Sequence, residues 1–174
     1  MAADNTSDIY FIDTSALVTL FRDYHHDLID SIWEKIEGLF RSGRMYSHRL
    51  VYDEITWDSK RPDLPSKKIT PLQAYFKPVT FEQAQIVSNI VKRFPGFIDI
   101  KSEKEESRPW LIAAGILEQR QLSLFNPDKT VFIVTEESEL DRNGVPTATK
   151  GFGLSHLNLN EFIRINNWSF KSVE

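Results

Sequence analysis

The start of the chain carries the feature that most constrains its fold. An apolar run at residues 9–12 has the length of a strand and stops at Asp13, which the hydroxyl residues Thr14 and Ser15 follow at once. Such side chains can cap a helix that begins there. Open α/β sheets bind their ligands outside the carboxyl ends of parallel strands. Asp13 is therefore a candidate metal ligand, and capping of the next helix explains this segment equally well.

Length and composition indicate one globular domain over residues 1–174. The chain is 41% hydrophobic and 26% charged, a balance that supports a packed core and excludes a fibrous or disordered chain. It has no cysteine, so any metal must be held by oxygen or imidazole ligands, and cysteine nucleophiles are excluded. The net charge of −4 argues against coating of nucleic acid by bulk positive charge.

The N-terminus and the apolar runs bear on localisation. Residues 1–8 are polar and acidic, whereas a secretory signal is basic and then apolar. No apolar run approaches the roughly 20 residues that a membrane span needs. We expect a cytoplasmic protein with no membrane partner.

Apolar periodicity predicts strands and helices in turn along the chain. Helices are expected at residues 16–24, 28–40, 48–57, 81–94, 109–119 and 160–168, and strands at residues 9–12, 44–47, 131–134 and 156–159. Segments 58–68 and 143–153 are expected to be loops, because proline and glycine interrupt regular structure. The alternation predicts an α/β sandwich with a mostly parallel central sheet flanked by helices.

Acidic side chains follow both of the continuous apolar strands. The strand at residues 131–134 is followed by Thr135, Glu136 and Glu137, as the first strand is followed by Asp13. If the strand tips bring these carboxylates together, each pair at ~4 Å costs about 4 kcal/mol at an effective dielectric near 20. A divalent cation relieves that cost, and oxygen ligands suit Mg²⁺ or Mn²⁺. The pattern predicts metal-assisted phosphodiester hydrolysis. Alternatively, Glu136 and Glu137 lie in the first turn of a following helix, where negative charge stabilises the helix dipole.

Four stretches, taken in order, resemble the PIN domain over nearly the whole chain. They are Phe11-Ile12-Asp13-Thr14-Ser15, Val51-Tyr52-Asp53-Glu54-Ile55, Pro109-Trp110-Leu111-Ile112-Ala113-Ala114 and Val131-Phe132-Ile133-Val134-Thr135-Glu136-Glu137. The sequence most resembles the DUF4411 branch, in which Asp-Pro-Trp-Leu-Ile-Ala and Val-Thr-Glu-Glu stretches recur. The resemblance implies a PIN-like three-layer sandwich and a metal-dependent endoribonuclease using Mg²⁺ or Mn²⁺. It also implies the toxin of a type II toxin-antitoxin pair, with an RNA substrate, a cognate antitoxin protein and a homodimeric state.

Carried over residue by residue, the resemblance makes Asp13, Glu54 and Glu137 the catalytic acids and metal ligands, with Glu136 as the alternative to Glu137. Glu54 as an exposed surface acid is the alternative for that position. Hydroxyl side chains that would orient ligands or a metal-bound water are Thr14, Ser15 and Thr135.

Arg108 departs from the family pattern, because it stands where the family places an aspartate before Pro-Trp-Leu-Ile-Ala. A guanidinium does not bind a cation, and we expect it to pair with Asp13 or Glu54 and partly replace the charge of the metal. Three interpretations follow. Glu105 or Glu106 supplies the missing oxygen; the remaining acids suffice for a single metal; or the site is catalytically impaired and the fold binds RNA or a partner protein.

Basic side chains near the expected site are candidate contacts to an RNA backbone. They are His48, Arg49, Lys60, Arg61, Lys67 and Lys68. For His48 and Arg49, a structural salt bridge is an equally good interpretation. The other four side chains belong to a basic run of a kind that is usually a solvent-exposed loop. A phosphatase is the weaker rival, because no glycine-rich phosphate loop follows either strand.

Overall fold

The computed structural model describes residues 8–24, 26–57, 64–97 and 106–169. Its strands are β1 (Ile9–Ile12), β2 (Met45–His48), β3 (Phe76–Lys77), β4 (Val131–Val134) and β5 (Ser155–Leu157). Its α-helices are α1 (Thr14–Asp23), α2 (His26–Arg41), α3 (Arg49–Ile55), α4 (Leu64–Ile69), α5 (Phe81–Arg93), α6 (Ser107–Phe125), α7 (Val145–Gly151) and α8 (Leu159–Ile165). Short 3₁₀ helices occupy η2 (Thr70–Tyr75) and η3 (Pro95–Phe97).

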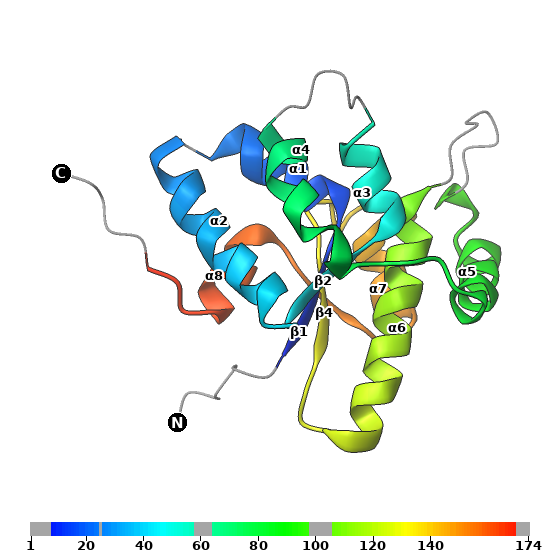
Figure 1. The fold of residues 1–174 in the computed structure, drawn as a ribbon. Coiled ribbons are helices and arrows are strands. Elements are labelled where there is room, and N and C mark those ends of the chain that lie inside the picture. Colours follow the sequence, from blue (N-terminus) through cyan, green and yellow to red (C-terminus); the bar gives the residue numbers. More distant parts are fainter. Residues whose placement is uncertain (1–7, 25, 58–63, 98–105, 170–174) are drawn as a thin grey trace.

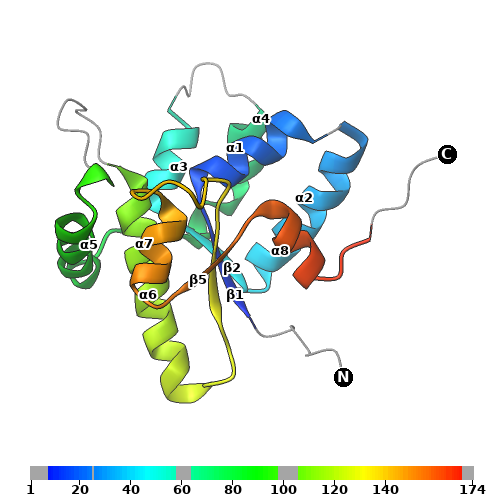
Figure 2. The same cartoon turned by 180° about the vertical axis from the view of Figure 1, so that it is seen from behind.

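The five strands form one sheet in the order β3-β2-β1-β4-β5, and every neighbouring pair is parallel. Helices α2 and α8 lie on one side of this sheet and α6 and α7 on the other (Figures 1 and 2). The expected α/β sandwich with a central parallel sheet and flanking helices is confirmed. No helix within the described residues is long and apolar enough to cross a membrane.

The central strands are buried on both faces, as continuous apolar runs in parallel sheets usually are. All four residues of β1 are buried, and Tyr10 lies between Met45 of β2 and Phe132 of β4 in the sheet register. Helix α6 packs closely against β4, since a Cβ added at Gly115 would lie 2.9 Å from Cδ1 of Ile133. A larger residue at position 115 therefore requires the Ile133 side chain to move, and glycine allows the helix its close approach to the strand.

Two segments that were expected to be loops contain helices, and that expectation is wrong for their described parts. Pro65 is the second residue of α4, and Pro146 is the second residue of α7. Proline is tolerated in the first turn, where its missing N–H has no intrahelical partner to lose. Residues 58–63 lie outside the described residues. Helix α6 also begins at Ser107, two residues before the expected start at Pro109.

The ends of β1 and β4 lie together and set the position of the site. The backbone N–H of Asp13 donates to the carbonyl oxygen of Val134 at 3.0 Å. The N–H of Thr135 donates in turn to the carbonyl oxygen of Leu157 at 2.9 Å. Residues that follow β1 and β4 therefore emerge side by side at the carboxyl edge of the sheet.

Candidate functional site

Asp13 is buried at the junction of β1 and α1, with 2% of its surface exposed. One carboxylate oxygen accepts the backbone N–H of Ala16 at 2.8 Å, so Asp13 is the N-cap of α1. The carboxylate also accepts hydroxyl hydrogens from Ser15 at 2.8 Å and Thr135 at 2.6 Å. Burial raises the pKa of Asp13 to about 6, although these hydrogen bonds oppose the rise, and the negative charge of Glu137 adds to it.

Glu54 extends from α3 across the start of α1 to the start of α6. One of its carboxylate oxygens accepts the hydroxyl of Thr14, and the other accepts the backbone N–H of Ser107 at 3.2 Å. Its side chain is exposed to solvent. Glu54 is thus on the surface, as the common role of glutamate predicts, yet it is oriented by two segments that are far away in the sequence.

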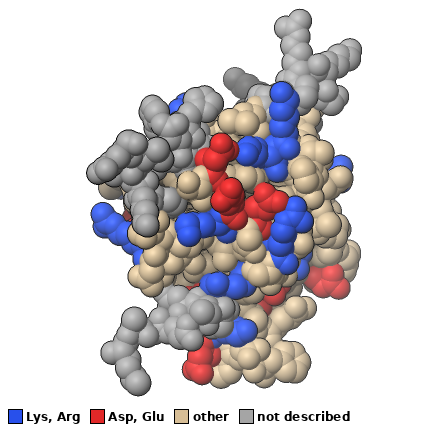
Figure 3. Space-filling model, turned by 60° about the vertical axis from the view of Figure 1, so that its left-hand side comes forward, with Lys and Arg blue, Asp and Glu red and all other residues tan. Residues whose placement is uncertain are grey.

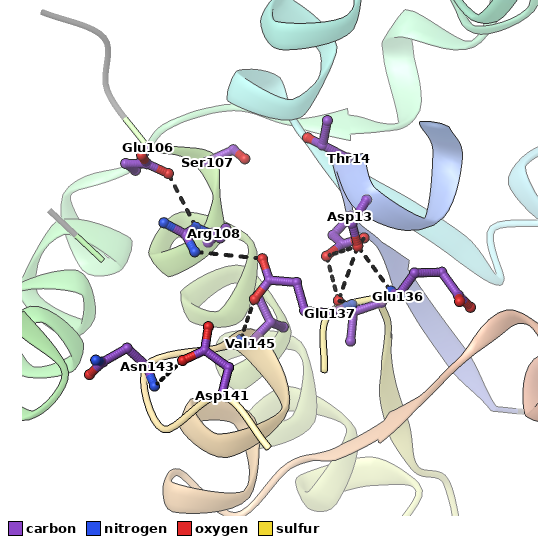
Figure 4. Close-up of polar contacts among 12 residues, drawn as sticks. Asp13, Thr14, Glu106, Ser107, Arg108, Glu136, Glu137, Asp141, Asn143 and Val145 are labelled. Atoms are coloured by element: carbon purple, nitrogen blue, oxygen red, sulfur yellow. Dashed lines mark hydrogen bonds and ion pairs between the residues drawn. The ribbon is translucent and has the colours of Figure 1, made fainter. Parts of the chain in front are cut away.

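The two acids after β4 point in different directions (Figure 4). Glu137 accepts the backbone N–H of Val145 at 2.8 Å, at the start of α7. Glu136 accepts the backbone N–H of Leu159 at 2.5 Å, at the start of α8. Both carboxylates therefore serve helix N-termini, where negative charge is favourable. Only Glu137 of the two faces the residues around Asp13, so Glu136 is not brought to the candidate site.

Arg108 lies in the first turn of α6, and its guanidinium makes two ion pairs. Its Nε is 3.1 Å from Oε2 of Glu106, and its Nη1 is 3.6 Å from Oε1 of Glu137. The guanidinium carbon lies 5.1 Å from the centre of the Phe97 ring. The expectation that Arg108 pairs with Asp13 or Glu54 is therefore wrong, since its ion-pair partners are Glu106 and Glu137. The reason is the position of the guanidinium, which lies beside Glu106, two residues earlier in the chain, and over the Phe97 ring.

A cleft of about 310 Å³ opens where these side chains meet. Its lining includes the three predicted acids Asp13, Glu54 and Glu137, and also Glu106 and Arg108. Four carboxylates thus face one guanidinium. Because like charges repel, this excess of negative charge favours the binding of a cation.

The arrangement does not form a ready-made metal site. Among the residues that the structure describes, no three His, Cys, Asp or Glu side chains are placed so that they hold one metal ion. Carboxylate oxygen is the ligand type that Mg²⁺ and Mn²⁺ prefer. However, each acid of the cleft is turned toward its own hydrogen-bond donors or toward Arg108. Glu105 lies outside the described residues, whereas Glu106 lines the cleft and pairs with Arg108.

Of the predicted RNA contacts, His48 lies inside the protein and is 0% exposed. Its Nδ1 accepts the backbone N–H of Leu50 at 3.2 Å, so Nε2 carries the proton and donates to Oε1 of Gln83 at 3.2 Å. The ring stacks on Trp110 with 5.8 Å between the ring centres. Burial lowers the pKa of His48 and favours the neutral ring. The geometry therefore favours a structural role for this residue.

The basic side chains are largely matched by acids. Nε of Arg49 is 2.9 Å from Oδ1 of Asp53, and Nζ of Lys68 is 3.1 Å from Oδ1 of Asp30. On the face drawn in Figure 3, Lys and Arg side chains are interspersed with Asp and Glu side chains and form no continuous basic surface among the described residues. Lys67 is exposed on α4. The candidates Lys60 and Arg61 lie outside the described residues.

Sequence reasoning missed the backbone donors of Ser107 and Val145, which hold Glu54 and Glu137. A signal for the second was present in the sequence. The N-cap of α7 is Gly144, which has no side-chain acceptor, so the first N–H groups of this helix need an acceptor from elsewhere. Phe97 beneath Arg108 had no local signal, because the two residues are far enough apart in the sequence that no helix or strand period links them.

Comparison with known families gives one match. A family model described as "Domain of unknown function (DUF4411)" matches residues 10–170. Comparison with curated proteins found no match. The resemblance to DUF4411 inferred from the sequence motifs is confirmed.

Proposed function

The chain belongs to the DUF4411 family, and from this premise we propose that it is a PIN-type ribonuclease that depends on Mg²⁺ or Mn²⁺. One observation carries the proposal: Asp13, Glu54 and Glu137, from distant parts of the chain, line a single cleft at the carboxyl edge of a parallel sheet. Ligands of open α/β sheets bind at that edge. The excess of carboxylates there attracts a cation, which a polyanionic substrate needs before it can enter such a cleft.

The chain's own residues would orient the ligands. The hydroxyls of Ser15 and Thr135 and the N–H of Ala16 hold the Asp13 carboxylate in one orientation. Ser107 and Thr14 do the same for Glu54. Hydrogen bonds of this kind orient carboxylate ligands. When bound, a divalent ion supplies charge neutralisation at the phosphate and an activated water.

The choice of substrate and partners rests on the resemblance to the PIN domain. It makes RNA the substrate, and it makes the chain the toxin of a type II toxin-antitoxin pair that is inhibited by a cognate antitoxin. A homodimer belongs to the same proposal.

Incubation of the purified chain with single-stranded RNA and Mn²⁺ tests the activity. We expect cleavage that stops when EDTA removes the metal. Asp13→Asn should lower the rate on the order of 100-fold, since it replaces a charged ligand by a neutral one of the same shape. The matched control is Asp53→Asn, whose carboxylate pairs with Arg49 and does not line the cleft. Intact RNA at every Mn²⁺ concentration with folded protein contradicts the proposal, and a phosphomonoester substrate tests the phosphatase rival.

A second candidate function is an RNA-binding module that does not cut. The observation that favours it is Arg108, which occupies the acidic cleft and pairs with Glu137. In this case the chain binds RNA in the presence of EDTA, and Mn²⁺ changes neither the binding nor the length of the RNA. An electrophoretic mobility shift with and without EDTA separates the two candidates.

A further inference from the structure

The guanidinium of Arg108 is attached to the cleft by contacts of unequal strength. Its Nε–H donates to Oε2 of Glu106 at 3.1 Å, and the guanidinium stacks over Phe97. Its Nη1 is 3.6 Å from Oε1 of Glu137, which is too long for a hydrogen bond. Glu106 and Phe97 therefore hold Arg108 in place, and the contact with Glu137 is the weaker of the two ion pairs.

Glu137 divides its two carboxylate oxygens between two roles. Oε2 accepts the N–H of Val145 at 2.8 Å, which ties the side chain to the start of α7. Oε1 has only the long contact with Arg108 among the contacts of the described residues. Because Oε2 already anchors the side chain, Oε1 can exchange its partner while the cap of α7 stays intact.

Charge favours such an exchange. Arg108 is the one Lys or Arg among the described residues that line the cleft, where it faces Asp13, Glu54, Glu106 and Glu137. Its ion pairs reach Glu106 and Glu137, and within the described part of the chain Asp13 and Glu54 have no cationic partner. A single guanidinium thus neutralises the cleft incompletely, and a divalent cation would compete with it for the same carboxylate.

We propose that Arg108 is a built-in counter-ion of the cleft that competes with a divalent cation for Oε1 of Glu137. The proposal rests on the proposed function in placing a divalent cation in this cleft. It explains why the acids line one cleft without forming a ready-made metal site. The guanidinium of Arg108 lies beside Oε1 of Glu137, where a bound cation would otherwise lie. It also means that the affinity of the cleft for a divalent cation is lower than it would be without Arg108. That affinity depends on how firmly Glu106 and Phe97 hold the guanidinium.

Isothermal titration calorimetry with Mn²⁺ tests this competition. Arg108→Gln removes the charge and keeps a polar side chain, and we expect it to bind Mn²⁺ on the order of tenfold more tightly than the unmodified chain. The matched control is Arg41→Gln, which removes an arginine that pairs with Glu37 on α2, outside the cleft. This control should leave Mn²⁺ affinity unchanged. Equal affinities for the Arg108→Gln variant and the unmodified chain overturn the proposal.

A second measurement uses the unmodified chain and stays valid if Arg108→Gln fails to fold. In a ¹⁵N spectrum, titration with Mg²⁺ should shift the Nε–H signal of Arg108 and leave that of Arg41 in place. Saturation with Mg²⁺ without any shift of the Arg108 signal overturns the proposal.

The outcomes separate this proposal from the ribonuclease proposal. Tighter Mn²⁺ binding by Arg108→Gln without RNA cleavage by either protein supports the counter-ion and contradicts the nuclease. Equal Mn²⁺ binding with cleavage of RNA does the reverse. Absence of Mn²⁺ binding to both proteins at millimolar concentration overturns both. Weaker RNA binding by Arg108→Gln at unchanged Mn²⁺ affinity assigns Arg108 to the substrate phosphate and also overturns the counter-ion role.

Discussion

At the scale of single residues, Asp13 has two opposite effects on stability, because its carboxylate caps a helix but is also buried away from water. It caps α1 through Ala16, and it is a buried carboxylate with a pKa raised to about 6. A raised folded-state pKa means that the native state binds a proton more tightly than the unfolded chain does. Ionised Asp13 therefore costs stability at neutral pH.

This cost is measurable as a pH-dependent effect of Asp13→Asn. The stability contribution of Asp13 is greatest below its ordinary pKa of 3.8 and falls as pH rises toward 6 and above. At pH 7 the ionised carboxylate costs up to about 3 kcal/mol relative to pH 3, by 1.36 kcal/mol per pKa unit. We expect Asp13→Asn to gain unfolding free energy relative to the unmodified chain as pH rises from 4 to 7, measured by urea denaturation in EDTA.

The Asp53→Asn variant is the control for this series, because Asp53 is exposed and paired with Arg49. Its difference from the unmodified chain should change little between pH 5 and 7. If the difference in unfolding free energy between Asp13→Asn and the unmodified chain does not change with pH, ionisation of the buried Asp13 carboxylate does not destabilise the fold.

At the scale of elements, two short helices depend at their N-termini on acids from elsewhere in the chain. Glu137 accepts a hydrogen bond from the start of α7, and Glu136 accepts one from the start of α8. Helices of this length are marginal alone. The segment after β4 thus holds the starts of two later helices through its carboxylates, and only Glu137 of the two also lines the cleft.

The packing of α6 on β4 gives a prediction at the same scale. Gly115→Leu places a large side chain where a Cβ alone would lie 2.9 Å from Ile133, and we expect a loss of about 1–3 kcal/mol of unfolding free energy. Gly38→Leu in α2 is the matched control, since an added Cβ there meets nothing within 4 Å. The control should be stabilising by about 0.5–1 kcal/mol, because glycine is a poor helix former. Equal effects of the two substitutions in denaturant unfolding would contradict the close approach of α6 to the sheet.

At the scale of the whole molecule, the cleft joins segments that are distant in sequence, so its occupation should stabilise the entire fold. Glu54 contacts Thr14 and Ser107, and Glu137 contacts Arg108. A ligand that binds only the native state at 100 times its dissociation constant adds about 2.7 kcal/mol. For a chain of this size that corresponds to a rise in Tm of roughly 5–10 °C.

Thermal unfolding in a Mn²⁺ titration measures this rise, with EDTA as the reference. Asp13→Asn should show a smaller rise than the unmodified chain, because it lacks the buried carboxylate that faces the cleft. The same Tm rise in both proteins would place the metal somewhere else on the molecule.

The sequence by itself determined the elements whose signals are local. The apolar runs at β1 and β4 and the amphipathic pattern of α5 predicted those elements within a residue, and the capping box of Thr80 and Gln83 explains where α5 begins. The motif order also indicated the DUF4411 family and the acids that line the cleft. These signals work because the period of a strand or helix and its caps depend on neighbouring residues.

Only the tertiary structure decided the partners of the charged side chains. Nothing near Arg108 in the sequence shows that it contacts Glu137 rather than Asp13, and nothing near His48 shows that Trp110 and Gln83 enclose it. Helices α4 and α7 escaped detection because they are short and begin with proline-containing turns. Which carboxylate meets which cation depends on where distant segments come together, and that is set by the packing of helices on the sheet, which no local pattern encodes.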